Sequence, residues 1–162
     1  MADPLHTYLN DHLAGATMGR DLARTLAERC AGTPSGPEMA RVAREIADDR
    51  DTLEAIMARV GARRSRAKRL MGWMMERAAR PAMATRSGEP DDLGELRAFE
   101  MLCVGVEGKC CLWEGLRTLS ESVPPLRRTD YDDLLARARA QRAWLEEQRL
   151  AATGRVGAAA GA

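Results

Sequence analysis

Apolar residues recur at intervals of three and four residues along four long stretches of the chain, which is the spacing of one helix face. Asp3 and Pro4 resemble a helix cap and a first-turn proline, and Ser35 with Glu38 matches a capping box. Pro124 and the residue after it end the third stretch. The pattern predicts an all-α protein with helices over residues 3–32, 35–61, about 91–122, and from 129 or 130 to 153.

The lengths of the connections predict how these helices are arranged. Short loops join the first helix to the second and the third to the fourth, so each pair should form an antiparallel hairpin. A crossover over residues 61–90 separates the hairpins, and its apolar spacing predicts a short extra helix from Ser65 to Pro81. We therefore expect one helical domain over residues 1–153, followed by a disordered small-residue tail over 154–162.

Each long helix has one polar residue in the middle of its apolar face. These residues are His12, Asp49, Glu107 and Gln141. A buried carboxylate needs a partner, so the four side chains should meet one another, water or a metal ion. Three neighbouring acids offer alternative inward positions, namely Asp11, Glu45 and Glu100.

The placement of these acids, the chain length and the long crossover resemble the ferritin-like superfamily, which includes rubrerythrin and bacterioferritin. The segment Glu45-Ile46-Ala47-Asp48-Asp49-Arg50-Asp51-Thr52 is similar to the second-helix Glu-x-x-His segment of that family. The resemblance implies a ferritin-like four-helix bundle. In di-iron members, the first and third helices each supply a Glu, and the second and fourth each supply Glu-x-x-His.

This chain departs from that pattern on three of the four helices. His12 stands where the first helix should supply Glu, and Thr52 stands where the second should supply His. The fourth helix has Gln141 and Trp144 in place of Glu and His. With only two histidines in the chain, two Glu-x-x-His motifs cannot be built, so we expect the di-iron site to have been lost.

Two interpretations of the mid-helix residues remain. In one, His12, Asp49, Glu107 and Gln141 form a polar network that fixes the register of the helices. In the other, Asp49, Glu107 and His12 bind a single divalent ion such as Mn, Fe or Zn. The mid-helix glycines Gly15, Gly19, Gly105 and Gly108 are expected to serve close helix packing or to make room for Trp113 and Trp144.

Composition excludes several classes of function. Twenty-five basic residues balance 24 acidic ones, so no overall charge favours nucleic acid. No apolar run is long enough for a transmembrane helix and no secretory signal is visible, which makes a cytoplasmic location the expectation. No Gly-rich phosphate loop, serine elbow or Cys-His pair indicates an enzyme.

The four cysteines predict neither a disulfide nor a copper store. Cys103 and Cys110 share one predicted helix, where their separation of about 10 Å is too long for a disulfide. Copper storage needs many inward thiols, and this chain has only Cys30, Cys103, Cys110 and Cys111. We expect ordinary thiols in a reducing compartment.

A basic cluster lies at the start of the crossover, and its residues are Arg63, Arg64, Arg66, Lys68 and Arg69. Because an amphipathic segment with Trp73 follows, the cluster could bind anions or a membrane surface, or the segment could form a dimer contact. The sequence as a whole favours a ferritin-like protein without a di-iron site, acting as a non-catalytic structural or partner-binding module and forming a homodimer. The alternatives are a metal-binding protein or oxidoreductase and an anion- or membrane-surface binder.

Overall fold

A computed structural model describes residues 3–64 and 91–161 of the chain. This part is all-α, with four long helices and one short 3-10 helix. The helices are α1 (Pro4–Arg29), α2 (Gly36–Arg59), α4 (Asp91–Leu119) and α5 (Tyr131–Ala160), and the 3-10 helix is η1 (Pro124–Arg128). The prediction of a four-helix all-α protein is confirmed.

Two of the helix starts follow the capping signals of the sequence and one does not. The Asp3 carboxylate accepts the Leu5 N–H at 2.8 Å, and the Asp130 carboxylate accepts the Asp133 N–H at 3.0 Å. Ser35 makes no such bond, because its backbone is already helical and its hydroxyl lies 3.1 Å from that of Thr33. The predicted capping box at the start of α2 is therefore wrong.

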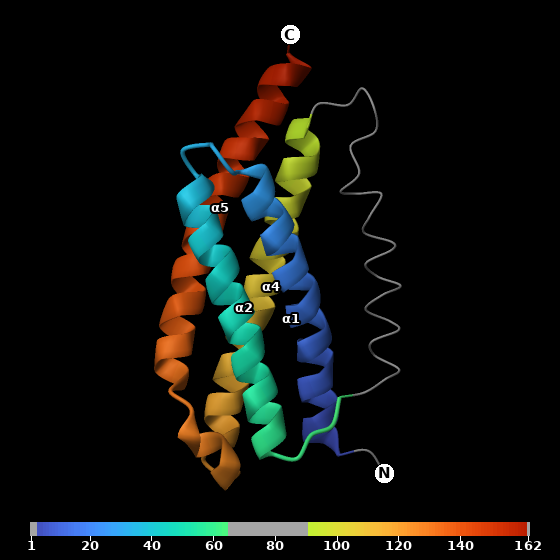
Figure 1. The fold of residues 1–162 in the computed structure, drawn as a ribbon, viewed down its shortest axis with the longest axis vertical. Coiled ribbons are helices and arrows are strands. Elements are labelled where there is room, and N and C mark those ends of the chain that lie inside the picture. The colour runs from blue at the N-terminus through green and yellow to red at the C-terminus, as the bar shows by residue number, and fades with distance from the viewer. Residues whose placement is uncertain (1–2, 65–90, 162) are drawn as a thin grey trace.

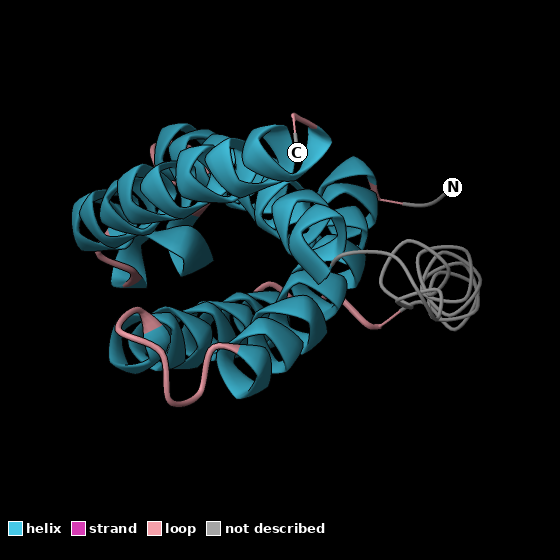
Figure 2. Cartoon of the chain, turned by 90° about the horizontal axis from the view of Figure 1, so that it is seen from above, coloured by secondary structure: helices cyan, strands magenta, loops and turns pink. Residues whose placement is uncertain are grey.

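The helices form two antiparallel hairpins, α1 with α2 and α4 with α5 (Figure 1). α1 and α5 run in one direction and α2 and α4 in the other, so the end of α2 and the start of α4 lie at opposite ends of the bundle. The hairpins meet where α1 packs against α4, and Figure 2 shows them as two arms joined along this line. The backbones of α2 and α5 approach less closely, and long side chains bridge them.

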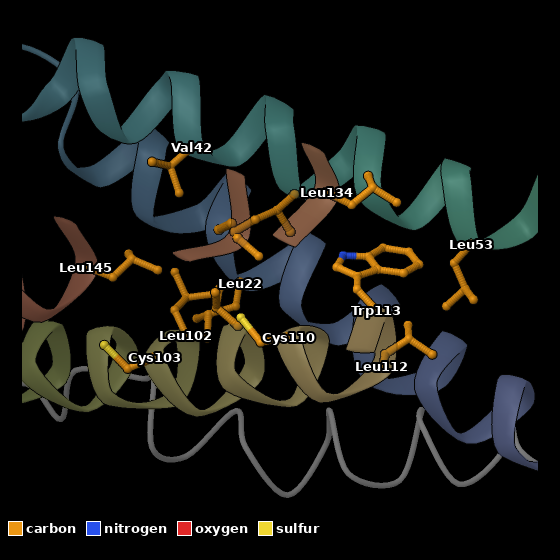
Figure 3. Close-up of a cluster of buried hydrophobic side chains, with 14 of the residues drawn as sticks. Leu22, Val42, Leu53, Leu102, Cys103, Cys110, Leu112, Trp113, Leu134 and Leu145 are labelled. Atoms are coloured by element: carbon orange, nitrogen blue, oxygen red, sulfur yellow. The ribbon is translucent and has the colours of Figure 1, made fainter. Parts of the chain in front are cut away.

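Apolar residues from all four helices build the core between the hairpins. Trp113 is 1% exposed and rises from α4 towards α2, with Leu53 at one side of its ring (Figure 3). At one end of the bundle, Leu126 of η1 is fully buried, and the Tyr131 hydroxyl donates to its carbonyl oxygen at 3.0 Å. The 3-10 turn after Pro124 therefore closes the core between α4 and α5.

The C-terminal segment differs from the prediction. Residues 154–160 continue α5 instead of forming a disordered tail. Ala152 is fully buried, and the Arg155 guanidinium donates to Asp92 at 3.2 Å and to Glu95 at 2.7 Å. The small residues after Gly154 suggested disorder, but alanine is the strongest helix former, and these two ion pairs tie the last turns to α4.

Two further predictions concern the crossover and the membrane. The expected extra helix over residues 65–81 lies outside the described residues. Within the described ranges, no helix combines the length and apolar character that crossing a membrane requires.

Candidate functional site

Asp49 occupies the middle of the buried face of α2. It stands one turn after Ile46 and one turn before Leu53, and it is only 2% exposed. Its two carboxylate oxygens have different partners. Oδ2 accepts from Lys109 Nζ of α4 at 2.6 Å, and Oδ1 accepts from Arg137 Nε of α5 at 3.1 Å. Asp49 therefore links three helices through charge-assisted hydrogen bonds.

Lys109 extends these contacts to Gln141 and Glu45. The Lys109 ammonium also donates to Gln141 Oε1, and Gln141 is fully buried. Gln141 Nε2 in turn donates to Glu45 Oε2 of α2 at 2.9 Å. We call this set the buried ion-pair network, and its members are Glu45, Asp49, Lys109, Arg137 and Gln141.

The charges of this network balance. Its two carboxylates face two cations, and Glu45 has a further ion pair with Arg41 near the surface. Burial lowers the pKa of Lys109, because removing an ammonium from water disfavours its charged form, and the neighbouring Asp49 opposes that shift. Losing either partner would leave an uncompensated charge in the core.

The structure brings together only some of the four mid-helix residues. Asp49 and Gln141 are linked through Lys109. His12 is half-buried and makes an edge-on ring contact with Tyr8, with centroids 4.6 Å apart, and burial lowers its pKa. Glu107 is 66% exposed and lies 3.9 Å from Arg142, on another face of α4.

The expectation that Glu107 lies in the core is wrong, and helix geometry gives the reason. Each residue turns an α-helix by about 100°, so Glu107 and Lys109 point in nearly opposite directions. Lys109 belongs to the apolar series Leu102, Val106, Lys109 and Trp113, whose spacing of four, three and four marks the inward face. That spacing could have identified Lys109, but lysine is seldom buried without a partner.

The proposed ligand set for a divalent ion is not assembled. Glu107 lies away from the cavity that Asp49 and His12 line, and instead lines a surface depression between α4 and α5. Of the three alternative acids, Glu45 reaches the network, whereas Asp11 and Glu100 are exposed. Over residues 3–64 and 91–161, no group of three or more His, Cys, Asp or Glu side chains could hold a metal ion.

A cavity of about 210 Å³ lies beside the buried ion-pair network, between α1, α2 and α4. Asp49 and Lys109 form part of its wall, together with His12, Arg50 and Trp113. Gly15, Gly19, Gly105 and Gly108 also line it, and a Cβ atom built on any of them would meet nothing within 4 Å. Among residues 3–64 and 91–161, close helix packing and room for a tryptophan therefore do not require glycine at these positions, contrary to the sequence-based interpretation.

The basic cluster is only partly described. The Arg64 guanidinium pairs with Glu54, and the Arg63 backbone carbonyl accepts from Asn10 Nδ2 at 3.0 Å. Arg66, Lys68 and Arg69 lie outside the described residues. Anion or membrane binding by this cluster stays a prediction.

All four cysteines are free thiols. Cys30, Cys103 and Cys110 are buried in the apolar core, and Cys111 is exposed on α4. Burial raises the pKa of Cys110, because a thiolate is disfavoured away from water. The absence of a Cys103–Cys110 disulfide agrees with the sequence prediction.

Comparison with known proteins adds no relative to this description. No family model matches the chain, and no curated protein or solved structure is detectably similar to it.

Proposed function

We propose that this chain is a divergent ferritin-like bundle that has lost the di-iron site and acts as a non-catalytic binding module. The up-down-down-up order of its four helices and the long crossover between α2 and α4 support the ferritin-like part of the proposal. The cavity of about 210 Å³ supports the binding part, because it offers a partly open volume between α1, α2 and α4.

The observation that carries the loss of the metal site is the position of Lys109. Its ammonium donates to Asp49 and Gln141, two of the mid-helix residues at which a di-iron protein would supply ligands. The positive charge that a metal ion would supply to Asp49 comes from a side chain of the same chain. A cation bound at Asp49 would have to displace Lys109 and Arg137.

Metal analysis of the full chain, purified without chelator, tests this proposal. We expect less than stoichiometric Fe, Mn or Zn and no increase in melting temperature when each ion is added. The matched variants are Asp49→Ala, which removes the buried acid, and Asp51→Ala, which removes an exposed acid of the same helix. Stoichiometric metal that is lost in Asp49→Ala and retained in Asp51→Ala would overturn the proposal.

The partner in this proposal is a second copy of the chain. Met101 and Val104 are exposed on the same side of α4, and Val104 is 73% exposed. A covering protein surface would remove these apolar side chains from water. Sedimentation equilibrium should show a dimer that Val104→Asp dissociates, whereas the exposed polar variant Glu107→Asp should leave it intact. A monomer at all concentrations would contradict this part.

A further inference from the structure

An apolar ridge runs along the exposed side of α4. It consists of Met101, which is 38% exposed, and Val104, which is 73% exposed. Each of them stands one helical turn before a glycine, Met101 before Gly105 and Val104 before Gly108. Because residues one turn apart lie on the same side of a helix, the ridge and these two glycines share one face of α4.

The cavity of about 210 Å³ opens on this same face. Gly105 and Gly108 line it from α4, and Gly15 and Gly19 line it from α1. Gly15 and Gly105 are also exposed, so the cavity reaches the surface between the two helices. Behind the glycines its wall is mainly apolar, with side chains from Ile46, Leu53, Leu102, Val106 and Leu112. An apolar ridge and an apolar opening therefore lie side by side on the surface.

Two contacts fix how α1 and α4 are aligned along each other. Each joins a side chain of α1 to the Cβ position of a glycine of α4, at 3.1 and 3.9 Å, and the pairs are Tyr8 with Gly115 and Arg29 with Gly94. Because the two helices are antiparallel (Figure 1), both pairs give the same alignment. It places Gly15 level with Gly108, and Asp11 one turn further towards the start of α1.

The face has an acid near one end and a base near the other. Asp11 is exposed and forms part of the edge of the cavity. Arg97 is exposed on α4, one turn before Met101. In the alignment of α1 and α4, about 15 residues of helical rise separate Asp11 from Arg97, which is about 22 Å. The two charges therefore do not meet within one chain, and the apolar ridge lies between them.

These charges define a two-fold axis on the face. A second copy related by such an axis runs antiparallel, so the acidic end of each copy meets the basic end of the other. The midpoint between the levels of Arg97 and Asp11 falls beside Val104, in the middle of the ridge. About this axis, Arg97 faces the partner's Asp11. Met101 then lies at the level of the partner's Gly108, where the cavity opens.

We propose that a second copy of the chain docks on this face, and that each copy places Met101 in the cavity of the other. The inference rests on the proposed dimer and specifies which surfaces meet and which side chain enters the cavity. An apolar cavity of about 150 Å³ holds a benzene ring, so this cavity has room for a methionine side chain. Methionine is flexible and fills irregular spaces well. The absence of side chains at the four glycines is what admits the partner.

Charge reversal tests this arrangement by sedimentation equilibrium of the full chain. Arg97→Asp and Asp11→Arg each place like charges at both ends of the dimer, so each variant alone should dimerise at least about tenfold more weakly. An equimolar mixture of the two variants restores opposite charges at both ends and should dimerise as the original chain does. Because the two residues lie about 22 Å apart in one chain, only pairing between chains produces this rescue. Arg44→Asp is the control, since it changes the charge equally on α2 and should leave the dimer intact.

The second test concerns the side chain that enters the cavity. Met101→Ser should weaken dimerisation at least about tenfold, because it removes the apolar side chain from the partner's cavity. Leu150→Ser shortens a 56% exposed side chain of α5 and should have no effect. Gly108→Leu fills the opening and should also weaken the dimer, with circular dichroism and thermal melts establishing that it folds. If it does not fold, Met101→Ser decides, because Met101 lies outside the core.

The outcomes separate this inference from the proposed function. A dimer that persists in both single charge variants, or that their mixture does not restore, would overturn the two-fold arrangement and keep the proposed dimer. A dimer that Met101→Ser leaves unchanged would likewise overturn the entry of Met101 into the cavity. A monomer at every concentration would overturn the proposed dimer itself and assign this face to a different occupant.

Discussion

Replacing Asp49 by alanine should destabilise this protein strongly. The change removes the carboxylate that accepts from Lys109 and Arg137 and leaves Lys109 with Gln141 as its described partner. Arg137 is 29% exposed and can turn towards water or Asp133, which lies 3.9 Å away. Lys109 is 13% exposed and its ammonium cannot reach water as easily, so its charge accounts for most of the lost stability.

The magnitude follows from the two ways in which the folded chain can respond. Breaking a buried ion pair by removing one partner typically destabilises a protein by about 3–5 kcal/mol. The chain can instead release the Lys109 proton, which at pH 7 costs about 4.6 kcal/mol from an ordinary lysine pKa of about 10.4. Because Lys109 releases its proton once that costs less than keeping an unpaired ammonium, deprotonation limits the cost of the buried charge. We therefore expect a loss of about 3–5 kcal/mol in the free energy of unfolding.

The pH dependence of this loss has a definite sign. Burial already lowers the pKa of Lys109 in the folded chain, and removal of Asp49 lowers it further. Between the folded and unfolded pKa values, the unfolded chain binds the proton that the folded chain has released. Stability therefore rises as the pH approaches about 10.4, and the deficit of Asp49→Ala should shrink between pH 7 and pH 10.

Urea denaturation at pH 7 and pH 10, followed by circular dichroism, measures the loss in the free energy of unfolding and how that loss changes with pH. At the expected loss, the melting temperature of a chain of this size should fall by about 6–20 °C. Asp51→Ala is the matched control, because Asp51 lies on the same helix, has a comparable contact with Arg50 and is 69% exposed. A loss below about 1 kcal/mol for Asp49→Ala, or a deficit that grows with pH, would refute the assigned role of Lys109.

The other predictions concern single side chains. Lys109→Met should cost less stability than Asp49→Ala, because Asp49 keeps Arg137, and a larger loss in urea denaturation would contradict this order. Glu107→Ala should change the free energy of unfolding by no more than about 0.5 kcal/mol, measured in the same way, because Glu107 is exposed. Cys111 should react first with a thiol reagent in the folded chain, and the three buried cysteines should stay protected until the chain unfolds. Mass spectrometry that finds all four cysteines labelled at the same rate would disprove this.

The sequence predicts the helices of this protein well, because their apolar faces are long and regular. The boundaries that failed depend on local contacts that spacing does not encode. Ser35 has the residue type of a cap, but its backbone is helical and its hydroxyl turns to Thr33. The last turns of α5 look like a small-residue tail, but Arg155 pairs with Asp92 and Glu95 of another helix.

The candidate site was predicted only in part, because the sequence marks a buried polar residue by the apolar series that it interrupts. Asp49 and Gln141 stand out because they interrupt apolar series, and both are buried. Glu107 stands between the buried Cys103 and Cys110 but is itself exposed, and the positions of α4 that line the cavity beside Asp49 include Val106 and Lys109. Arg137 has no signal in the sequence, because its end is half-exposed and only the fold brings it from α5 to Asp49.

The unequal approach of the helices has a mechanical consequence. The two hairpins pack closely along α1 and α4, whereas the backbones of α2 and α5 lie farther apart and are joined by the side-chain hydrogen bonds Asp49–Arg137 and Glu45–Gln141. These hydrogen bonds join α2 to α5 on the side of the bundle away from the contact between α1 and α4. We therefore expect the bundle to open first between α2 and α5, where these polar contacts break and water enters. The apolar contact between α1 and α4 would stay closed at that stage.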